Sequence, residues 1–242
     1  MGKRRFEDVF HAIWTLGPRA RSLELIDGPV ESHAELTQSF SDIALSNRRF
    51  GGTSAARHAL SKTKPCSVLD VGAGTGDIAR TLRAEYRRRG RDVTFTCLDN
   101  NAHLIAVARE QSNGDPGLSY VEGNALSIPF SDETFDVAMC NLALHHFDPE
   151  PAVALLREMR RVSRIAPVVT DLRRSVFSWL AVFAFSRVFS TNRLTRHDGP
   201  LSARRAYTPR EALHLARSAG WTKPVVERFQ LIRLVMYDAA RL

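Results

Sequence analysis

The stretch Val68-Leu-Asp-Val-Gly-Ala-Gly-Thr-Gly-Asp-Ile-Ala-Arg80 decides the fold of this chain. It places three glycines, at positions 72, 74 and 76, between a short apolar run and a run of helical character. A strand that leads directly into a helix leaves the first N–H groups of the helix without partners. Glycines allow a ligand to approach that backbone closely. The stretch therefore predicts a strand, a ligand-binding turn and a helix.

The sequence on either side alternates between strand-like and helix-like runs. We expect strands at 67–71, 93–99, 118–122, 135–140 and 165–171, and helices at 77–89, 102–111 and 151–162. Such alternation predicts an α/β fold, in which a parallel sheet carries helices on both faces. Two more strand-like runs, at 225–229 and 231–237, follow a helix that opens at Thr208, and we expect them to pair antiparallel at the sheet edge.

Two segments extend this core. Residues 1–62 are expected to form an N-terminal helical cap that acts as a lid, and the core occupies 63–242. The cap is predicted from a capping-box pattern that starts at Ser32, a short helix over 53–60, and a first helix with one apolar stripe. That stripe consists of Phe6, Val9, Phe10, Ile13 and Trp14. An apolar insertion at about 173–207 is the predicted substrate lid.

Composition narrows the function classes. The 242 residues are 44% hydrophobic with a formal net charge of +8, which allows an acidic partner, nucleic acid or peripheral contact with a membrane. The arginines are scattered, so we interpret them as solvated helix faces. Cys66, Cys97 and Cys140 form no CxxC pair and predict buried thiols in a reducing, cytoplasmic setting. We expect no signal peptide, and the apolar run 176–189 is too short to span a bilayer.

Charge indicates the kind of ligand that the glycine turn binds. Asp70 and Asp77 flank the turn, and two carboxylates would repel a phosphate. A cationic ligand is favoured instead, which points to S-adenosylmethionine. Asp99 follows Asp70 by about one βαβ unit, so its carboxylate is expected beside the same turn, where it can accept hydrogen bonds from both ribose hydroxyls.

These motifs resemble those of class I S-adenosylmethionine-dependent methyltransferases. The run 68–76 resembles their first motif and 97–100 the second, while 123–130 is similar to the GDAxxLPF segment of ubiquinone/menaquinone-type enzymes, of the methyltransferase type 11/12 kind. Residues 135–146 resemble their fourth motif. The resemblance implies a Rossmann-like seven-stranded sheet, mostly parallel with an antiparallel last strand, and S-adenosylmethionine as cofactor with S-adenosylhomocysteine as product.

The resemblance also implies cofactor-binding residues, which are Asp70, Gly72, Ala73, Gly74, Gly76, Asp99, Asn100, Leu104, Asn124, Ala125, Asn141 and Leu142. Asn124 stands where the family has Asp, and its side-chain oxygen can still accept a bond from the adenine amino group. Arg48 is a candidate for the cofactor carboxylate, with a surface charge as the alternative.

His145 and His146 follow the fourth strand, where the methyl acceptor should meet the sulfonium. Either imidazole could take the proton of a phenol, although methyl transfer can also proceed by positioning alone. The alternative is that the histidines only cap the strand end.

Four residues at the end of the fifth strand and beyond it are candidates for acceptor binding. Trp179 and Phe183 belong to the apolar run and could wall a pocket for a greasy ligand. Asp171 and Arg173 end the strand near the same face, with a surface ion pair or a helix cap as the alternative. We expect no metal site, because the histidines and carboxylates show no ligand spacing such as HxxxH.

A looser resemblance, in 47–52, 176–189 and 196–202, is to a bacterial methyltransferase group found beside type III polyketide synthases. It predicts a small lipophilic acceptor (a phenol, a quinone or a polyketide-derived ring) and O-methylation. One alternative is C-methylation of a quinone ring. Another is that the chain binds the cofactor without catalysing a reaction. Nucleic-acid methylation is disfavoured, because Asn141-Leu-Ala-Leu144 lacks the Asn-Pro-Pro-Tyr sequence of those enzymes. The oligomeric state stays open.

Overall fold

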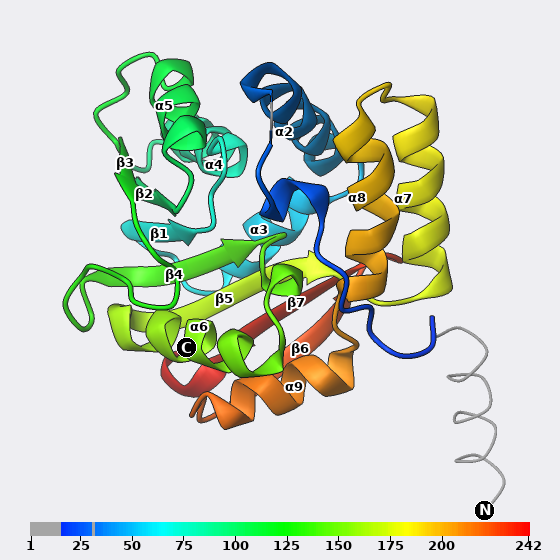
Figure 1. Cartoon of the computed structure of the whole chain (residues 1–242). Coiled ribbons are helices and arrows are strands. Elements are labelled where there is room, and N and C mark those ends of the chain that lie inside the picture. The colour runs from blue at the N-terminus through cyan, green and yellow to red at the C-terminus, as the bar shows by residue number, and fades with distance from the viewer. Residues whose placement is uncertain (1–15, 31) are drawn as a thin grey trace, which may run out of the picture.

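The computed structural model describes residues 16–30 and 32–242, and these form a seven-stranded sheet with helices on both faces (Figure 1). The spatial order of the strands is β3-β2-β1-β4-β5-β7-β6. Their bounds are β1 (Ser67–Val71), β2 (Thr94–Asp99), β3 (Leu118–Glu122), β4 (Phe135–Asn141), β5 (Ser163–Leu172), β6 (Pro224–Phe229) and β7 (Arg233–Asp238). The predicted helix over 6–14 lies outside the described residues.

Strand direction follows the prediction, with one refinement at the edge. The pairs among β1 to β5 are all parallel, whereas β7 runs antiparallel to both β5 and β6. The two last strands do pair with each other, but β7 is inserted between β5 and β6. The strand order reverses between β1 and β4, and the crevice beyond their carboxyl ends is where doubly wound sheets bind ligands.

Two helical layers cover the sheet. The layer on one face consists of α3 (Gly52–Ser61), α4 (Asp77–Arg88) and α5 (Ala102–Gln111), and on the other face lie α6 (Pro149–Val162) and α9 (Pro209–Ser218). Side chains that alternate along β1 explain both layers. Val68 packs into the buried cluster beneath α3, α4 and α5, whereas Leu69 and Val71 pack into the buried cluster beneath α6 and α9. These buried clusters confirm the predicted α/β fold.

A third group of elements lies over the carboxyl edge of the sheet. It comprises η1 (Leu25–Asp27), α2 (His33–Arg49), α7 (Val176–Val188) and α8 (Arg193–Arg205), and Figure 1 shows α2 beside α8 and α7 outside α8. The Ser32 hydroxyl accepts a bond from the Glu35 amide, as the capping pattern predicted. The helix predicted at 53–60 is present as α3, but it packs into the core against the sheet and does not contribute to a lid.

Helix α8 was not predicted, because it contains Gly199-Pro200. Pro200 cannot donate to the carbonyl of Arg196, and that oxygen instead accepts a bond from Arg187 on α7 at 2.9 Å. A Cβ at Gly199 would lie 3.1 Å from Val182, so the glycine allows α7 and α8 to pack closely. The tertiary contact with α7 therefore supports a helix whose local sequence opposes it.

Two short 3-10 helices complete the described chain, η2 (Leu144–His146) after β4 and η3 (Ala239–Arg241) at the end. Among the described residues, none of the helices combines the length and the apolar character needed to cross a bilayer.

Candidate functional site

The glycine turn after β1 brings bare backbone to the carboxyl edge. All three glycines, at 72, 74 and 76, have positive φ angles between 54° and 69°, a conformation that other residues adopt only with strain. A Cβ at Gly74 would lie 2.3 Å from the ring of Phe40. The amides of Gly72 and Ala73 donate to the carbonyl of Leu98, which ties the turn to β2. The turn is therefore rigid and closely covered by α2.

Asp99 lies beside this turn, as the sequence predicted. One carboxylate oxygen accepts from the Gly74 amide at 2.8 Å and the other from the Asn101 amide at 3.0 Å. Burial raises the pKa of Asp99, while these amides oppose the shift. Each carboxylate oxygen retains capacity for a further donor, so the group can hold a ligand hydroxyl in a fixed place.

Asp70 occupies the bottom of the crevice and is buried. Its side chain accepts a bond from the Asn141 amide at 3.1 Å, and the Thr170 hydroxyl donates to the oxygen of that same amide at 2.7 Å. Burial, together with the neighbouring carboxylates of Asp77 and Asp99, raises the pKa of Asp70 to about 8. A cationic ligand would reduce the electrostatic repulsion among these carboxylates, whereas a phosphate would increase it.

A cavity of about 450 Å³ joins the turn to the helices above it. Its walls come from β1, β2 and β4 below and from α2, η1, α7 and α8 above. The apolar lining away from the turn includes Leu36, Ile43, Leu172, Val182 and Phe185. The cavity thus has room for a small apolar molecule beside a ligand on the glycine turn.

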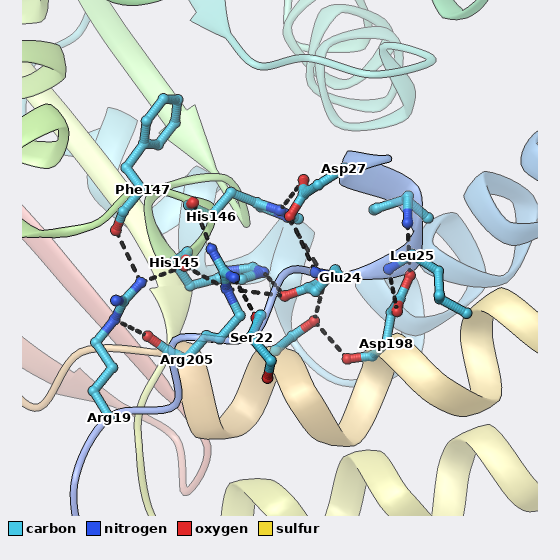
Figure 2. A network of polar contacts seen from close by, with 12 residues as sticks. Arg19, Ser22, Glu24, Leu25, Asp27, His145, His146, Phe147, Asp198 and Arg205 are labelled. Atoms are coloured by element: carbon cyan, nitrogen blue, oxygen red, sulfur yellow. Dashed lines mark hydrogen bonds and ion pairs between the residues drawn. The ribbon is translucent and has the colours of Figure 1, made fainter. Parts of the chain in front are cut away.

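Figure 2 shows a polar cluster centred on the two histidines of η2, both of which line this cavity. Nδ1 of His145 lies 2.7 Å from the Asp171 carboxylate, which also accepts from the His145 amide at 3.0 Å. Nδ1 of His146 lies 2.8 Å from Asp27 on η1. The two rings are tilted against each other, with centroids 4.4 Å apart. Each imidazole is therefore oriented through Nδ1 and turns Nε2 away from its carboxylate.

Glu24, just before η1, lies next to both Nε2 atoms. Its Oε1 is 3.6 Å from His145 and its Oε2 is 3.9 Å from His146. Burial raises the pKa of Glu24 to about 7. The Ser202 hydroxyl donates to Oε2 at 2.9 Å, while Oε1 is buried without a hydrogen-bond partner among the described residues. A carboxylate and two imidazoles thus converge on one point at the cavity wall.

The segment that carries Glu24 is fixed to α8. Asp198 accepts from the amides of Leu25 and Ile26 at 2.8 and 3.1 Å, and the guanidinium of buried Arg205 donates to the carbonyls of both histidines (Figure 2). The 16–30 segment therefore closes the cavity over η2 through specific polar contacts.

Most of the predicted cofactor residues come together here. Those that line the cavity are Asp70, Gly72, Ala73, Asp99, Asn100, Leu104, Asn124, Ala125, Asn141 and Leu142, joined by His145 and His146. Gly74 and Gly76 shape the turn from outside the lining. The Asn124 side-chain oxygen accepts from the Leu126 amide at 2.8 Å, so it also stabilises its own loop. Arg48 is exposed and does not line the cavity, whereas its neighbour Asn47 does.

The predicted acceptor residues fit less well. Trp179 packs against the cluster around Leu172, and Phe183 is 36% exposed and stacks on Trp179, so neither lines the cavity. Arg173 donates to the carbonyl of Leu231 outside the cavity. Asp171 lies behind His145 as its partner. The aromatic side chain that α7 contributes to the lining is Phe185, which the apolar run alone did not distinguish from its neighbours.

Three residues of the cluster, Glu24, Asp27 and Arg205, were not predicted from the sequence. The segment around Glu24 has no periodic pattern, and apart from nearby Asp27 the side chains that Glu24 approaches, such as His145 and Ser202, lie more than a hundred residues further along the chain. Only the fold brings Glu24 and Asp27 together with the histidines.

Comparison with known proteins is consistent with this geometry. Residues 68–165 match the family model described as a methyltransferase domain. The chain is 35% identical over 96 residues to a 2-phytyl-1,4-naphtoquinone methyltransferase of Thermosynechococcus vestitus, over 40% of each chain. It is 34% identical over 111 residues to the ubiquinone/menaquinone biosynthesis C-methyltransferase UbiE of Xanthomonas campestris, over 44% of this chain and 42% of that protein.

The chain therefore spans about two fifths of the length of the curated relatives it matches. Human N-acetylserotonin methyltransferase in complex with S-adenosylmethionine superposes with a TM-score of 0.65 at 15% identity, covering 97% of this chain and 66% of the human one. A likeness at this identity establishes the shared fold.

Proposed function

We propose that the chain is a class I S-adenosylmethionine-dependent methyltransferase that transfers a methyl group to an oxygen atom of a small lipophilic acceptor, a proposal supported by the methyltransferase domain that residues 68–165 match. One observation supports this above the others. A single cavity connects the glycine turn, where the donor would bind, with an apolar wall and a cluster of bases where an acceptor hydroxyl could lie. Holding both reactants in one cavity supplies much of the rate enhancement.

The residues of the turn fit the donor. S-adenosylmethionine supplies a methyl group on a positively charged sulfur. Asp99 would hold the ribose hydroxyls, and the buried carboxylate of Asp70 would face the cationic end of the donor. Asp70 is buried, so its charge would interact with the donor more strongly than it would in solvent.

For the carboxylate of the donor we propose Arg233 in place of Arg48. Arg233 lines the cavity and is buried, and it donates through Nε to the carbonyl of Phe50 at 2.9 Å. Its Nη1 has no hydrogen-bond partner among the described residues, and burial lowers its pKa to about 10. A carboxylate would satisfy this buried donor.

The acceptor is proposed to be apolar because of the walls that α2 and α7 contribute. Helix α7 presents Val182 and Phe185 to the cavity, while Leu180 and Val188 on its other side are 49% and 71% exposed. We propose that these exposed apolar side chains of α7 contact a membrane surface peripherally. An apolar acceptor could then pass from the membrane along α7 into the cavity.

We propose His145 as the group that removes the proton of the acceptor hydroxyl. Its Nδ1 faces the Asp171 carboxylate at 2.7 Å, an arrangement that leaves Nε2 as the acceptor atom and stabilises the imidazolium that forms. His146 is the second candidate, since Asp27 orients it in the same way.

C-methylation of a quinone ring is the second candidate function. It is supported by the two quinone-related relatives, whose names describe methyl transfer to a naphthoquinone and C-methylation in quinone biosynthesis. The same pocket would suit either acceptor, because both are flat, apolar and carry a hydroxyl in the reduced form.

The test uses trideuteromethyl S-adenosylmethionine and a panel of alkylphenols, quinols and aromatic polyketides. We expect a product heavier by the labelled methyl group, and its NMR spectrum distinguishes an O-methyl from a C-methyl group. The matched control is Asp99→Ala, which should abolish cofactor binding and turnover together. The proposal would be refuted if the protein gave no binding heat and no thermal shift with S-adenosylmethionine or S-adenosylhomocysteine. Labelling of nucleic acid alone would support nucleic-acid methylation instead.

A further inference from the structure

We propose that Glu24, His145 and His146 bind a divalent transition-metal ion at the acceptor end of the cavity, and that this ion holds the oxygen of the acceptor. The metal site itself stands on the geometry of the cluster. Only its role toward the acceptor rests on the proposed function. The sequence led us to expect no metal site, because the three residues have no ligand spacing along the chain.

The two imidazoles are oriented as metal ligands are. A ligating histidine usually donates its other ring N–H to a carboxylate, which fixes the tautomer and the direction of the ligating atom. Here Asp171 lies 2.7 Å from Nδ1 of His145 and Asp27 lies 2.8 Å from Nδ1 of His146. Both Nε2 atoms are left with a free lone pair on the side of Glu24 (Figure 2).

Glu24 supplies the third ligand atom, and its buried oxygen, unpartnered within the described chain, is an independent observation that favours a bound ligand. It is only 3% exposed, and its Oε1 has no hydrogen-bond partner among the described residues. One ligand atom from each of Glu24, His145 and His146 lies within 4.8 Å of the other two. Ligand atoms about 2.0–2.2 Å from a metal lie about 3–3.5 Å from one another, so the longest separation in the cluster needs to shorten by at most about 1.3–1.8 Å.

The charges around the cluster favour a cation. Four carboxylates gather here, from Glu24, Asp27, Asp171 and Asp198. Two guanidiniums also lie at the cluster: Arg205 has Nε 3.7 Å from Oε1 of Glu24, and Arg19 donates to the carbonyl of His145 at 2.7 Å. The N–H groups of Arg205 donate to backbone carbonyls and not to Glu24. Arg205 thus offsets part of the negative charge and leaves Oε1 available.

Two imidazoles and one carboxylate form a donor set that suits zinc, iron, cobalt or manganese, and is poor for calcium. Three protein ligands leave at least one coordination position for the acceptor, and coordination lowers the pKa of a bound hydroxyl. With the metal bound, His145 would be a ligand in place of the base proposed above for the metal-free protein, and the hydroxyl proton would leave to solvent. The new C–O bond would form as the S–C bond breaks, which would release S-adenosylhomocysteine.

The experiment measures metal binding directly, with untagged protein purified through chelator. We expect isothermal titration with Zn²⁺ to give one site per chain. Bound Co²⁺ should give a visible absorption spectrum typical of a cobalt ion with four or five ligands. Glu24→Gln and His146→Ala should each weaken Zn²⁺ binding at least 100-fold. Mg²⁺ should not compete. A shift in melting temperature with S-adenosylhomocysteine shows that each variant is folded, and it reports on the cofactor site independently of the metal.

The matched control is His103→Gln. His103 stacks on His33 with ring centroids 4.1 Å apart, so this pair also places two imidazoles side by side, but at the surface of α2 and α5. The control should bind Zn²⁺ like the unaltered protein. Absence of a stoichiometric site in the unaltered protein would overturn the proposal, as would equal affinity in Glu24→Gln. Turnover by metal-free protein at full rate would overturn the acceptor role and leave the proposed methyl transfer intact.

Discussion

Replacing Asp70 with Asn is expected to stabilise the cofactor-free protein while weakening its affinity for the cofactor. Asp70 is buried at the bottom of the crevice, where burial and two neighbouring carboxylates raise its pKa from 3.8 to about 8. The Asn141 amide that bonds to it at 3.1 Å would find an equivalent oxygen on the new side chain. The substitution therefore removes a titrating group without opening a cavity.

The size of the effect follows from proton linkage. Between pH 4 and pH 8 the folded protein retains the Asp70 proton, while the unfolded chain releases it near pH 3.8. The contribution of Asp70 to the free energy of unfolding therefore falls as the pH rises through that window. Above the folded-state pKa this contribution no longer changes with pH. At pH 7 the difference is about three pKa units, or about 4 kcal/mol. Burial of the replacing amide offsets part of this gain, so we expect about 2 kcal/mol.

Thermal unfolding of the cofactor-free protein measures this gain. For a chain of this size, about 2 kcal/mol corresponds to a rise of about 4–8 °C in Tm. The rise should be larger at pH 8 than at pH 5. Asp136→Asn is the matched control, because the amides of Cys66 and Ser67 and the guanidinium of Arg164 lower the pKa of Asp136. That control should lose stability at neutral pH and lose little near pH 3.

Cofactor binding should change in the opposite direction. Because we propose that Asp70 faces the cationic end of the donor, loss of its carboxylate should weaken S-adenosylmethionine binding about tenfold or more by calorimetry. A Tm for Asp70→Asn below that of the unaltered protein at pH 8 would refute the reasoning. So would a Tm difference that does not vary between pH 5 and pH 8, because the buried acid would then not carry the proton.

Three further predictions concern the walls of the cavity. Gly74→Ala places a Cβ 2.3 Å from the Phe40 ring at a φ of +54°, so the affinity for S-adenosylhomocysteine should fall at least tenfold in calorimetry; unchanged affinity would mean that the turn is not the binding surface. Phe185→Ala should raise the KM for the acceptor about tenfold, whereas Phe183→Ala on the exposed side of the same helix should leave it unchanged. Asp171→Asn should lower kcat about 10–100-fold with unaltered S-adenosylhomocysteine affinity, and a normal kcat would show that orientation of the neighbouring imidazole is dispensable.

The donor half of the site was accessible from the sequence because its signals are local. Gly72 and Asp99 lie at strand ends whose positions follow from the alternation of apolar runs, and parallel strands bring their carboxyl ends to one edge. The acceptor half has no such rule. The apolar run of α7 predicted a greasy wall, but the packing of α8 decides that Phe185 and not Trp179 faces the cavity.

The sequence by itself determined the doubly wound sheet, the strained glycine turn and the acid at the end of the second strand, since each depends on residues close along the chain. Tertiary structure alone decided that Glu24 meets the two histidines after β4 and that Arg233, and not Arg48, lines the cavity. The physical reason is that burial changes what a polar side chain needs. A buried carboxylate or guanidinium must find partners, and which partners are near is known only after segments distant along the chain have packed together.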